Sequence, residues 1–177
     1  TEDANSRNTA IGYQALKTLN AGADSESTAI GYLAGLNLTT GTENVLVGGR
    51  AGDALTDADY NVVVGRGALT TDTKGNKTVA IGTAALSAQN FTSSTDTYNV
   101  AVGYNAGQLV TTGTHNTFIG GLAGDADTTG YYNVAVGASA LSANTTAISN
   151  TAVGYASLGA NTTGTLNTAV GKASLDA

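Results

Sequence analysis

The chain contains no cysteine, proline, methionine or tryptophan among its 177 residues. Without cysteine there can be no disulfide and no thiolate metal site. The sequence therefore gives no information on whether the protein resides in an oxidising or a reducing compartment. The absence of proline suits a chain in which nearly every segment donates backbone hydrogen bonds to a neighbouring strand. There is also no apolar run near 18 residues and no signal-peptide pattern, so we predict no insertion into a membrane.

Charged side chains are scarce as well. They make up 11 % of the sequence, and 7 Lys and Arg against 13 Asp and Glu give a formal net charge of −6. Nucleic acids require a basic protein face, and anionic membrane surfaces attract basic segments. The composition therefore argues against both as partners.

What the sequence does contain is a repeat built on Asn-Thr-Ala-Val-Gly, with clean copies at 150–154 and 167–171. The closing glycine recurs ten times, with gaps of 19, 17, 17, 17, 21, 17, 17, 17 and 17 residues. A fixed period over a whole chain is typical of a solenoid. We predict an all-β parallel β-solenoid (a β-roll) of ten coils of about 17 residues, as a single repeat domain over 8–177 that follows a linker or preceding coil at 1–7. The coils open at residues 8, 27, 44, 61, 78, 99, 116, 133, 150 and 167.

Each coil, numbered from its opening residue as position 1, predicts a short strand at positions 2 to 4. Position 2 is Thr or Val and position 4 is always Ile or Val, and β-branched residues favour strands. We expect these two positions, which share a strand face, to fill the solenoid interior. Position 3 points the other way and is apolar in all ten coils, although a face in contact with water should be polar. We therefore predict that position 3 forms the interface of a homotrimer around a common axis, through Ala10, Ala29, Leu46, Val63, Ala80, Ala101, Phe118, Ala135, Ala152 and Ala169.

A second short segment follows the closing glycine. Position 8 is Ala or Ser and position 9 is Leu or Gly, and we predict that these side chains pack back onto the strand. Where position 9 is Gly, position 12 is often apolar, as at Leu38, Leu55 and Val110, which would refill the volume. Coil seven departs from this rule with Asp127, which the pattern does not explain.

The opening position is Asn in eight of the ten coils. Stacked coils place equivalent side chains about 4.8 Å apart, where amides can hydrogen-bond along a column. We interpret this column as a structural ladder and not as a ligand site, with Ser27 and Thr78 as polar substitutes. Its members are Asn8, Asn44, Asn61, Asn99, Asn116, Asn133, Asn150 and Asn167.

The segments 8–16 and 150–167 carry the pattern Asn-Thr-Ala-Val/Ile-Gly-Tyr-x-Ala/Ser-Leu. This pattern resembles repeats of phage tail fibres and large bacterial surface proteins. It is also similar to the head repeat of trimeric autotransporter adhesins, although that repeat has a shorter period. The resemblance covers essentially the whole chain. It implies a homotrimer of parallel β-rolls on an extracellular fibre, carried by a virion or a bacterial surface, and it brings no catalytic residue with it.

Residues that could carry chemistry do not form a recognisable constellation. The single histidine, His115, has no triad partner and no companion metal ligand in the pattern. Aspartates cluster at 53–59 and 125–127, but a calcium site needs six or more oxygens and a glycosidase pair needs a cleft. We therefore predict no catalytic, cofactor-binding or metal site, and we expect that the protein is not an enzyme.

The leading functional hypothesis is a structural shaft or head segment of a homotrimeric fibre that takes part in host attachment. The alternative is a binding module that contacts a host glycan or surface protein through a column of tyrosines at position 6 or through the insertion at 89–97. Ice binding through the Thr-Thr rows is a further variant, but coils three and five interrupt the rows. A polysaccharide depolymerase is the remaining class. The candidate surface-binding residues are Tyr13, Tyr32, Tyr104, Tyr155 and Phe91.

Overall fold

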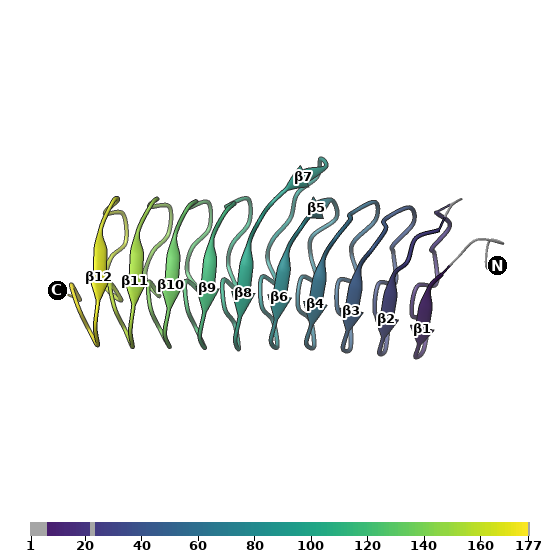
Figure 1. Ribbon diagram of the computed structural model, residues 1–177, viewed down its shortest axis with the longest axis horizontal. Coiled ribbons are helices and arrows are strands. Elements are labelled where there is room, and N and C mark those ends of the chain that lie inside the picture. Colours follow the sequence, from purple (N-terminus) through teal and green to yellow (C-terminus); the bar gives the residue numbers. More distant parts are fainter. Residues whose placement is uncertain (1–6, 22–23, 177) are drawn as a thin grey trace.

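The computed structural model describes residues 7–21 and 24–176 and confirms an all-β parallel β-solenoid (Figure 1). Ten strands pair in chain order into one parallel sheet, and about nine turns of roughly 17 residues connect them. None of the described residues forms a helix, so this part of the chain has no long apolar helix that could cross a membrane. The strands are β1 (Thr9–Ile11), β2 (Thr28–Ile30), β3 (Val45–Val47), β4 (Val62–Val64), β6 (Val79–Ile81), β8 (Val100–Val102), β9 (Thr117–Ile119), β10 (Val134–Val136), β11 (Thr151–Val153) and β12 (Thr168–Val170).

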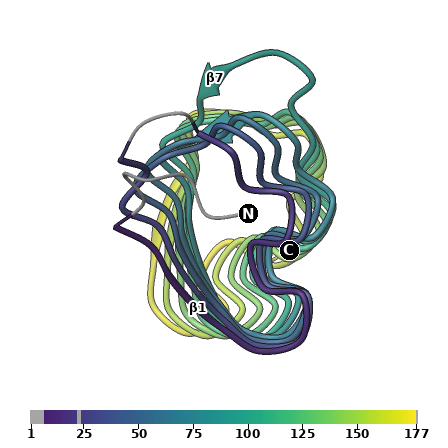
Figure 2. The same ribbon diagram turned by 90° about the vertical axis from the view of Figure 1, so that its right-hand side faces the viewer.

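The two longer coils keep the register of the sheet. Thr9 pairs with Thr28 and Val79 with Val100, so position 2 meets position 2 across the longer gaps too. A slip of one residue would turn every side chain of a strand to the other face, so extra residues must leave the coil. In coil five they form an arm in which β7 (Thr95–Asp96) pairs with β5 (Gly75–Asn76), beyond the outline of the other coils (Figure 2).

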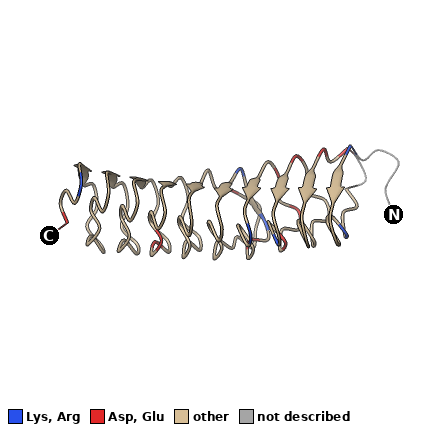
Figure 3. Cartoon of the chain, turned by 90° about the horizontal axis from the view of Figure 1, so that it is seen from below, with Lys and Arg blue, Asp and Glu red and all other residues tan. Residues whose placement is uncertain are grey.

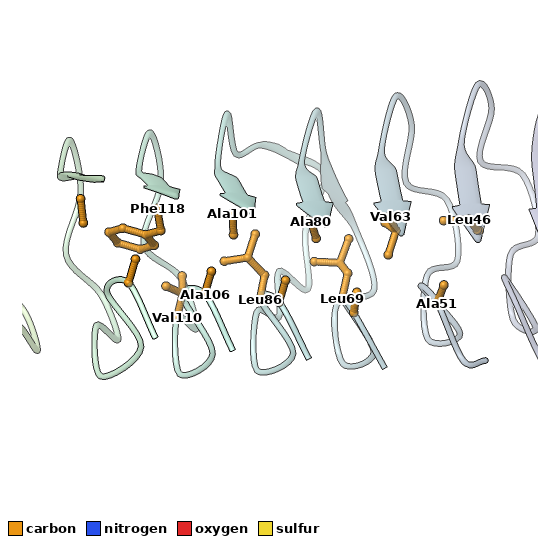
Figure 4. Packing of buried hydrophobic residues seen from close by; sticks show 14 of the residues in the cluster. Leu46, Ala51, Val63, Leu69, Ala80, Leu86, Ala101, Ala106, Val110 and Phe118 are labelled. Atoms are coloured by element: carbon orange, nitrogen blue, oxygen red, sulfur yellow. The ribbon is translucent and has the colours of Figure 1, made fainter. Parts of the chain in front are cut away.

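The strand faces are opposite to those predicted from the sequence. In coils two to ten the position 3 side chains are at most 2 % exposed. Figure 4 shows Ala80, Ala101 and Phe118 pointing from their strands into the interior. Positions 2 and 4 instead face outward and are half-buried or exposed along the whole sheet. The sheet therefore has a buried inner face of mostly small residues and a partly exposed outer face of β-branched ones.

The predicted trimer interface is wrong in its choice of face. Ala10, in the first coil, is exposed, but the other nine residues fill the core of their own chain and are out of reach of another copy. β-branched residues suit a strand on either face, so their presence at positions 2 and 4 did not identify the inner one. The residues that were predicted to form the interface but lie in the core are Ala29, Leu46, Val63, Ala80, Ala101, Phe118, Ala135, Ala152 and Ala169.

The second segment packs as predicted. Position 8 alanines and position 9 leucines form the wall opposite the strands, and Leu69 and Leu86 are fully buried and point at the sheet (Figure 4). Because a leucine reaches across the interior from this wall, the strand can offer only a small side chain at position 3. The narrow interior thus accounts for the alanines that the sequence analysis assigned to an interface.

Two large position 3 residues occupy the gaps that position 9 glycines leave. A Cβ added at Gly107 would lie 2.9 Å from the Phe118 ring, and one at Gly124 would lie 2.5 Å from it. Leu46 fills the equivalent gap beside Gly35 and Gly52. The apolar position 12 residues Leu38, Leu55 and Val110 are fully buried, so they refill volume as predicted. Coil seven has Asp127 at position 12, and there the Phe118 ring fills the gap beside Gly124.

Candidate functional site

The asparagine column runs through the interior, and its side chains bind the backbone of their own coil and of the next one. The Asn133 side chain accepts a hydrogen bond from the Asn150 N–H (3.0 Å) and donates one to the Ala147 carbonyl (2.8 Å). The same pair of contacts recurs for the coils that open at Asn44, Asn61, Asn99, Asn116 and Asn150. The column therefore stabilises the coil stack mainly by amide-to-backbone bonds. The predicted amide-to-amide bond is present between Asn167 and Asn150 (3.1 Å).

Buried polar side chains also occur at position 12, in two groups separated by the apolar Val110: Asp72 with Gln89, and Asp127 with Asn144. One carboxylate oxygen of Asp72 accepts a hydrogen bond from the Gln89 side chain (2.6 Å). The other oxygen accepts bonds from the backbone N–H groups of Gly75 (3.1 Å) and Phe91 (2.9 Å). This fully buried carboxylate ties the base of the arm to coil four.

Asp127 has the same role in coil seven. Its carboxylate accepts hydrogen bonds from the Gly130 N–H (2.8 Å) and from the side-chain amides of Asn133 (3.0 Å) and Asn144 (2.8 Å). Burial raises the pKa of Asp127 to about 6, although these three bonds act in the opposite direction. The residue that the sequence pattern left unexplained thus joins coils seven and eight from within.

Asp57 and Asp59 of the first acidic cluster have partners in neighbouring coils. The Asp59 carboxylate accepts a hydrogen bond from the Thr42 N–H (2.7 Å), and that of Asp57 lies 3.4 Å from the Lys74 ammonium. In the described part of the chain, no group of three or more histidine, aspartate or glutamate side chains is arranged to hold a metal ion. These carboxylates join neighbouring coils at the surface.

The tyrosines predicted at position 6 are all exposed, but the structure brings only two of them together. Tyr13 and Tyr32 stack with ring centroids 5.6 Å apart and an interplanar angle of 11°. Tyr104 and Tyr155 stand apart, because the intervening coils have Gly and Ala at this position. The Lys172 ammonium lies 6.0 Å from the Tyr155 ring centroid. The predicted column is therefore one stacked pair and two separate rings.

Phe91 was wrongly predicted to be a surface-binding residue. Its side chain is only 8 % exposed, at the base of the arm. The apolar ring packs inward while its backbone N–H binds the buried Asp72 carboxylate. The exposed residues of the arm are the polar run 92–94 and Asp96.

The sequence analysis missed an aromatic column directly before the strands. We call the residue preceding each opening residue position 0; there the backbone is left-handed, with φ between 49° and 61° in coils two to ten. His115 lies between Tyr98 and Tyr132, with ring centroids 5.2 Å and 4.9 Å away. The Lys77 ammonium lies 5.3 Å from the Tyr98 ring centroid. The 17-residue period could have revealed this column, because Tyr98, His115 and Tyr132 occupy the same position in successive coils.

The arm meets this aromatic column. The Asp96 carboxylate forms an ion pair with the Lys77 ammonium. It also accepts a hydrogen bond from the Tyr98 hydroxyl (3.3 Å). The bond from Lys77 lowers the pKa of Asp96, and the same contact raises the pKa of Lys77. The arm is thereby fixed beside the rings at the surface of coils five and six.

The outer face of the ten-stranded sheet is a uniform surface that runs along the rod. Position 4 is Ile or Val in every coil, and position 2 is Val or Thr. From residue 97 to residue 171 the only charged side chains are Asp125 and Asp127, neither of them at position 2 or 4. Figure 3 shows charge along the N-terminal half of the rod and almost none along the other half. This face is a regular, weakly polar strip of side chains.

Comparison of the chain with protein-family models, with curated proteins and with solved structures gives no match. The functional argument therefore rests on the coil geometry and the surfaces described above.

Proposed function

We propose that this chain is a structural segment, a shaft or head, of an extracellular fibre on a virion or bacterial surface. In this proposal it assembles as a homotrimer and supports or contributes to host attachment. The observation that carries the proposal is the uninterrupted ten-stranded parallel sheet, tied from coil to coil by the buried asparagine column. Ten strands at a spacing of about 4.8 Å make a rod roughly 45 Å long.

The internal bonding suits a spacer. Each coil is fixed to the next by strand pairing, by its opening side chain and by packing across the narrow interior. Each coil contacts only its neighbours along the axis, as in other quasi-one-dimensional repeat proteins. A rod held in this way resists bending and keeps its two ends apart. The described polar interior is occupied by hydrogen bonds between coils, which supports a mechanical role and no catalytic one.

Light scattering after size exclusion, combined with small-angle X-ray scattering, tests the proposal. We expect a mass of three chains at micromolar concentration and a rod-shaped particle. A well-folded monomer under these conditions would contradict the assembly. Release of reducing sugar from a host polysaccharide would contradict the non-catalytic role.

A binding module is the second candidate, and the aromatic rings beside the arm favour it. Tyr98 and Tyr132 are 48 % and 55 % exposed, and tyrosine offers an apolar ring with a polar tip. On this hypothesis a host glycan or surface protein contacts these rings or the arm. A glycan array probed with the native chain and with the double variant Tyr98→Ser/Tyr132→Ser tests it, with Tyr104→Ser as the control. Binding that only the double variant loses would support this candidate, and an array without hits would count against the glycan.

A further inference from the structure

We infer that copies of this chain meet on the outer face of the ten-stranded sheet, parallel and in register. We call this surface the sheet face and define it by positions 2 and 4 of every coil, bordered by position 0. The inference rests on the proposed function, which supplies the assembly, and it names the surface and the register that the assembly uses.

The composition of the sheet face is the first argument. Position 4 gives ten β-branched apolar side chains in an unbroken column, of which Ile119 is 39 % and Val170 is 69 % exposed. Position 2 adds five valines and five threonines beside them. Scattered apolar side chains are normal on a protein surface, but a contiguous apolar patch marks an interaction site. A single chain would leave this strip in contact with water along the whole rod.

The size of the strip is the second argument. Its length is roughly 45 Å, and positions 0 to 4 span about 15 Å including side-chain margins. The area is then about 700 Å², close to the roughly 800 Å² per partner of a stable protein interface. A second copy has a strip of the same length and spacing, so the two can match from end to end.

Charge decides the relative direction of the copies. Position 0 carries Arg7, Glu26, Glu43 and Lys77 in the N-terminal half but no Lys, Arg, Asp or Glu from coil six onward. An antiparallel arrangement would set these charges against the uncharged half, where they would lose water without gaining partners. A parallel arrangement in register sets the uncharged half against itself and keeps the charges at a common end, where Arg7 pairs with Glu26 and Lys77 with Asp96 within each chain.

The backbone restricts how the copies touch. Within the sheet each strand already pairs with its neighbours along the rod, so the sheet face offers only side chains. Packing therefore uses side chains alone, and in the proposed homotrimer the three sheet faces turn toward the common axis. Short β-branched side chains suit such a close approach, and their stiff rotamers lose little entropy on contact.

Single-cysteine cross-linking tests the inference, and the chain is well suited to it because it has no cysteine. Val136→Cys places a thiol on the sheet face in coil eight. Ser142→Cys is the matched control, since Ser142 is also half-buried but follows Leu141 on the wall opposite the strand. Both variants of the full chain are treated with a short thiol-reactive cross-linker, and their mass is measured by light scattering beforehand.

We expect Val136→Cys to yield mainly a covalent pair of chains and Ser142→Cys to stay mainly uncross-linked. An oligomer in which Val136→Cys does not cross-link, or cross-links no better than Ser142→Cys, would overturn the inference while the proposed assembly stands. Cross-linking of Val136→Cys only after mixing with Val47→Cys, the equivalent residue of coil three, would show an antiparallel pair and overturn the register. A monomeric native chain would remove the proposed assembly and this inference together.

Discussion

The two halves of the rod share one coil design but differ at their surfaces. Coils one to five contain both departures from the 17-residue period, and all four ion pairs found among the described residues lie within 7–96. Coils six to nine have a constant length and, apart from Asp125 and Asp127, no charged residue. The sheet continues across both halves, and the asparagine column is interrupted only at Ser27 and Thr78, both in the first half. The difference shows that interior contacts determine the coil. The charged residues are concentrated in the half with irregular coil lengths, and they do not determine the fold.

Each half also has one place where a large side chain replaces the usual alanine. Leu46 lies between the glycines of coils two and three, and Phe118 between those of coils six and seven. The two halves thus solve the same packing problem with different residues. The comparison predicts that interior substitutions will have equal consequences in the two halves, whereas surface charges will matter little in either.

The largest expected effect comes from the glycine that ends each strand. Gly65 and Gly137 have φ of 143° and 140°, and a Cβ at either would overlap the carbonyl oxygen of the equivalent glycine in the next coil. We expect Gly65→Ala and Gly137→Ala to lower the free energy of unfolding by roughly 3 kcal/mol or more each. Chemical denaturation at a fixed protein concentration measures this. Gly49→Ala is the control, because a Cβ there meets nothing within 4 Å, and its effect should stay within about 0.5 kcal/mol. A tolerated alanine in only one half would break the equivalence.

The next effect comes from the two large core residues. Phe118→Ala should cost about 3–5 kcal/mol and Leu46→Ala about 2–5 kcal/mol, since each leaves a cavity against glycines that cannot fill it. Urea midpoints compared with that of Leu109→Ala, whose parent side chain is 48 % exposed, would show the contrast. Equal midpoints for Phe118→Ala and Leu109→Ala would mean that the interior of the regular half is not close-packed.

A pH dependence distinguishes the regular half. The pKa of Asp127 is about 6 in the folded chain and near 3.8 when unfolded. Between these values the folded state holds a proton that the unfolded state has lost, so stability falls as pH rises through this window, by roughly 3 kcal/mol. The pKa of Asp125 is raised in the same direction by burial, whereas that of Asp96 is lowered and has the opposite effect.

The measurement is the difference in unfolding free energy between the native chain and Asp127→Asn from pH 4 to pH 7. The variant should lose the part of the decline that belongs to Asp127 and keep the contributions of the other carboxylates. Parallel profiles for the two proteins would show that Asp127 does not titrate in this range.

The smallest effect is expected from the ion pairs of the irregular half. Lys77 and Asp96 are exposed to solvent, and exposed pairs are screened and contribute little. Lys77→Gln should therefore leave the thermal midpoint unchanged within error, at low salt and in 1 M NaCl alike. A clear loss of stability at low salt only would mean that charge helps to hold the irregular half together.

Several features of this molecule could be predicted because they are local. The period locates every strand, and the closing glycine is required where the backbone passes close to the next coil. The asparagine column also follows from the period, since one phase of a regular stack forms one line through it. The exposure of Tyr13, Tyr32, Tyr104 and Tyr155 agrees with their prediction as surface residues.

Which side of the strand lies inside was decided only by the tertiary structure. Positions 2, 3 and 4 are all largely apolar, and an alternation with hydrophobic residues on both faces does not define an interior. The opposite wall decides it: leucines such as Leu69 and Leu86 reach across a narrow core and leave room only for small side chains. The burial of Phe91 and the environment of Asp127 have the same origin, because each depends on a neighbouring coil whose side chains the repeat pattern does not position. Periodicity along the chain determined the solenoid, and packing between its walls determined which surface it shows to its surroundings.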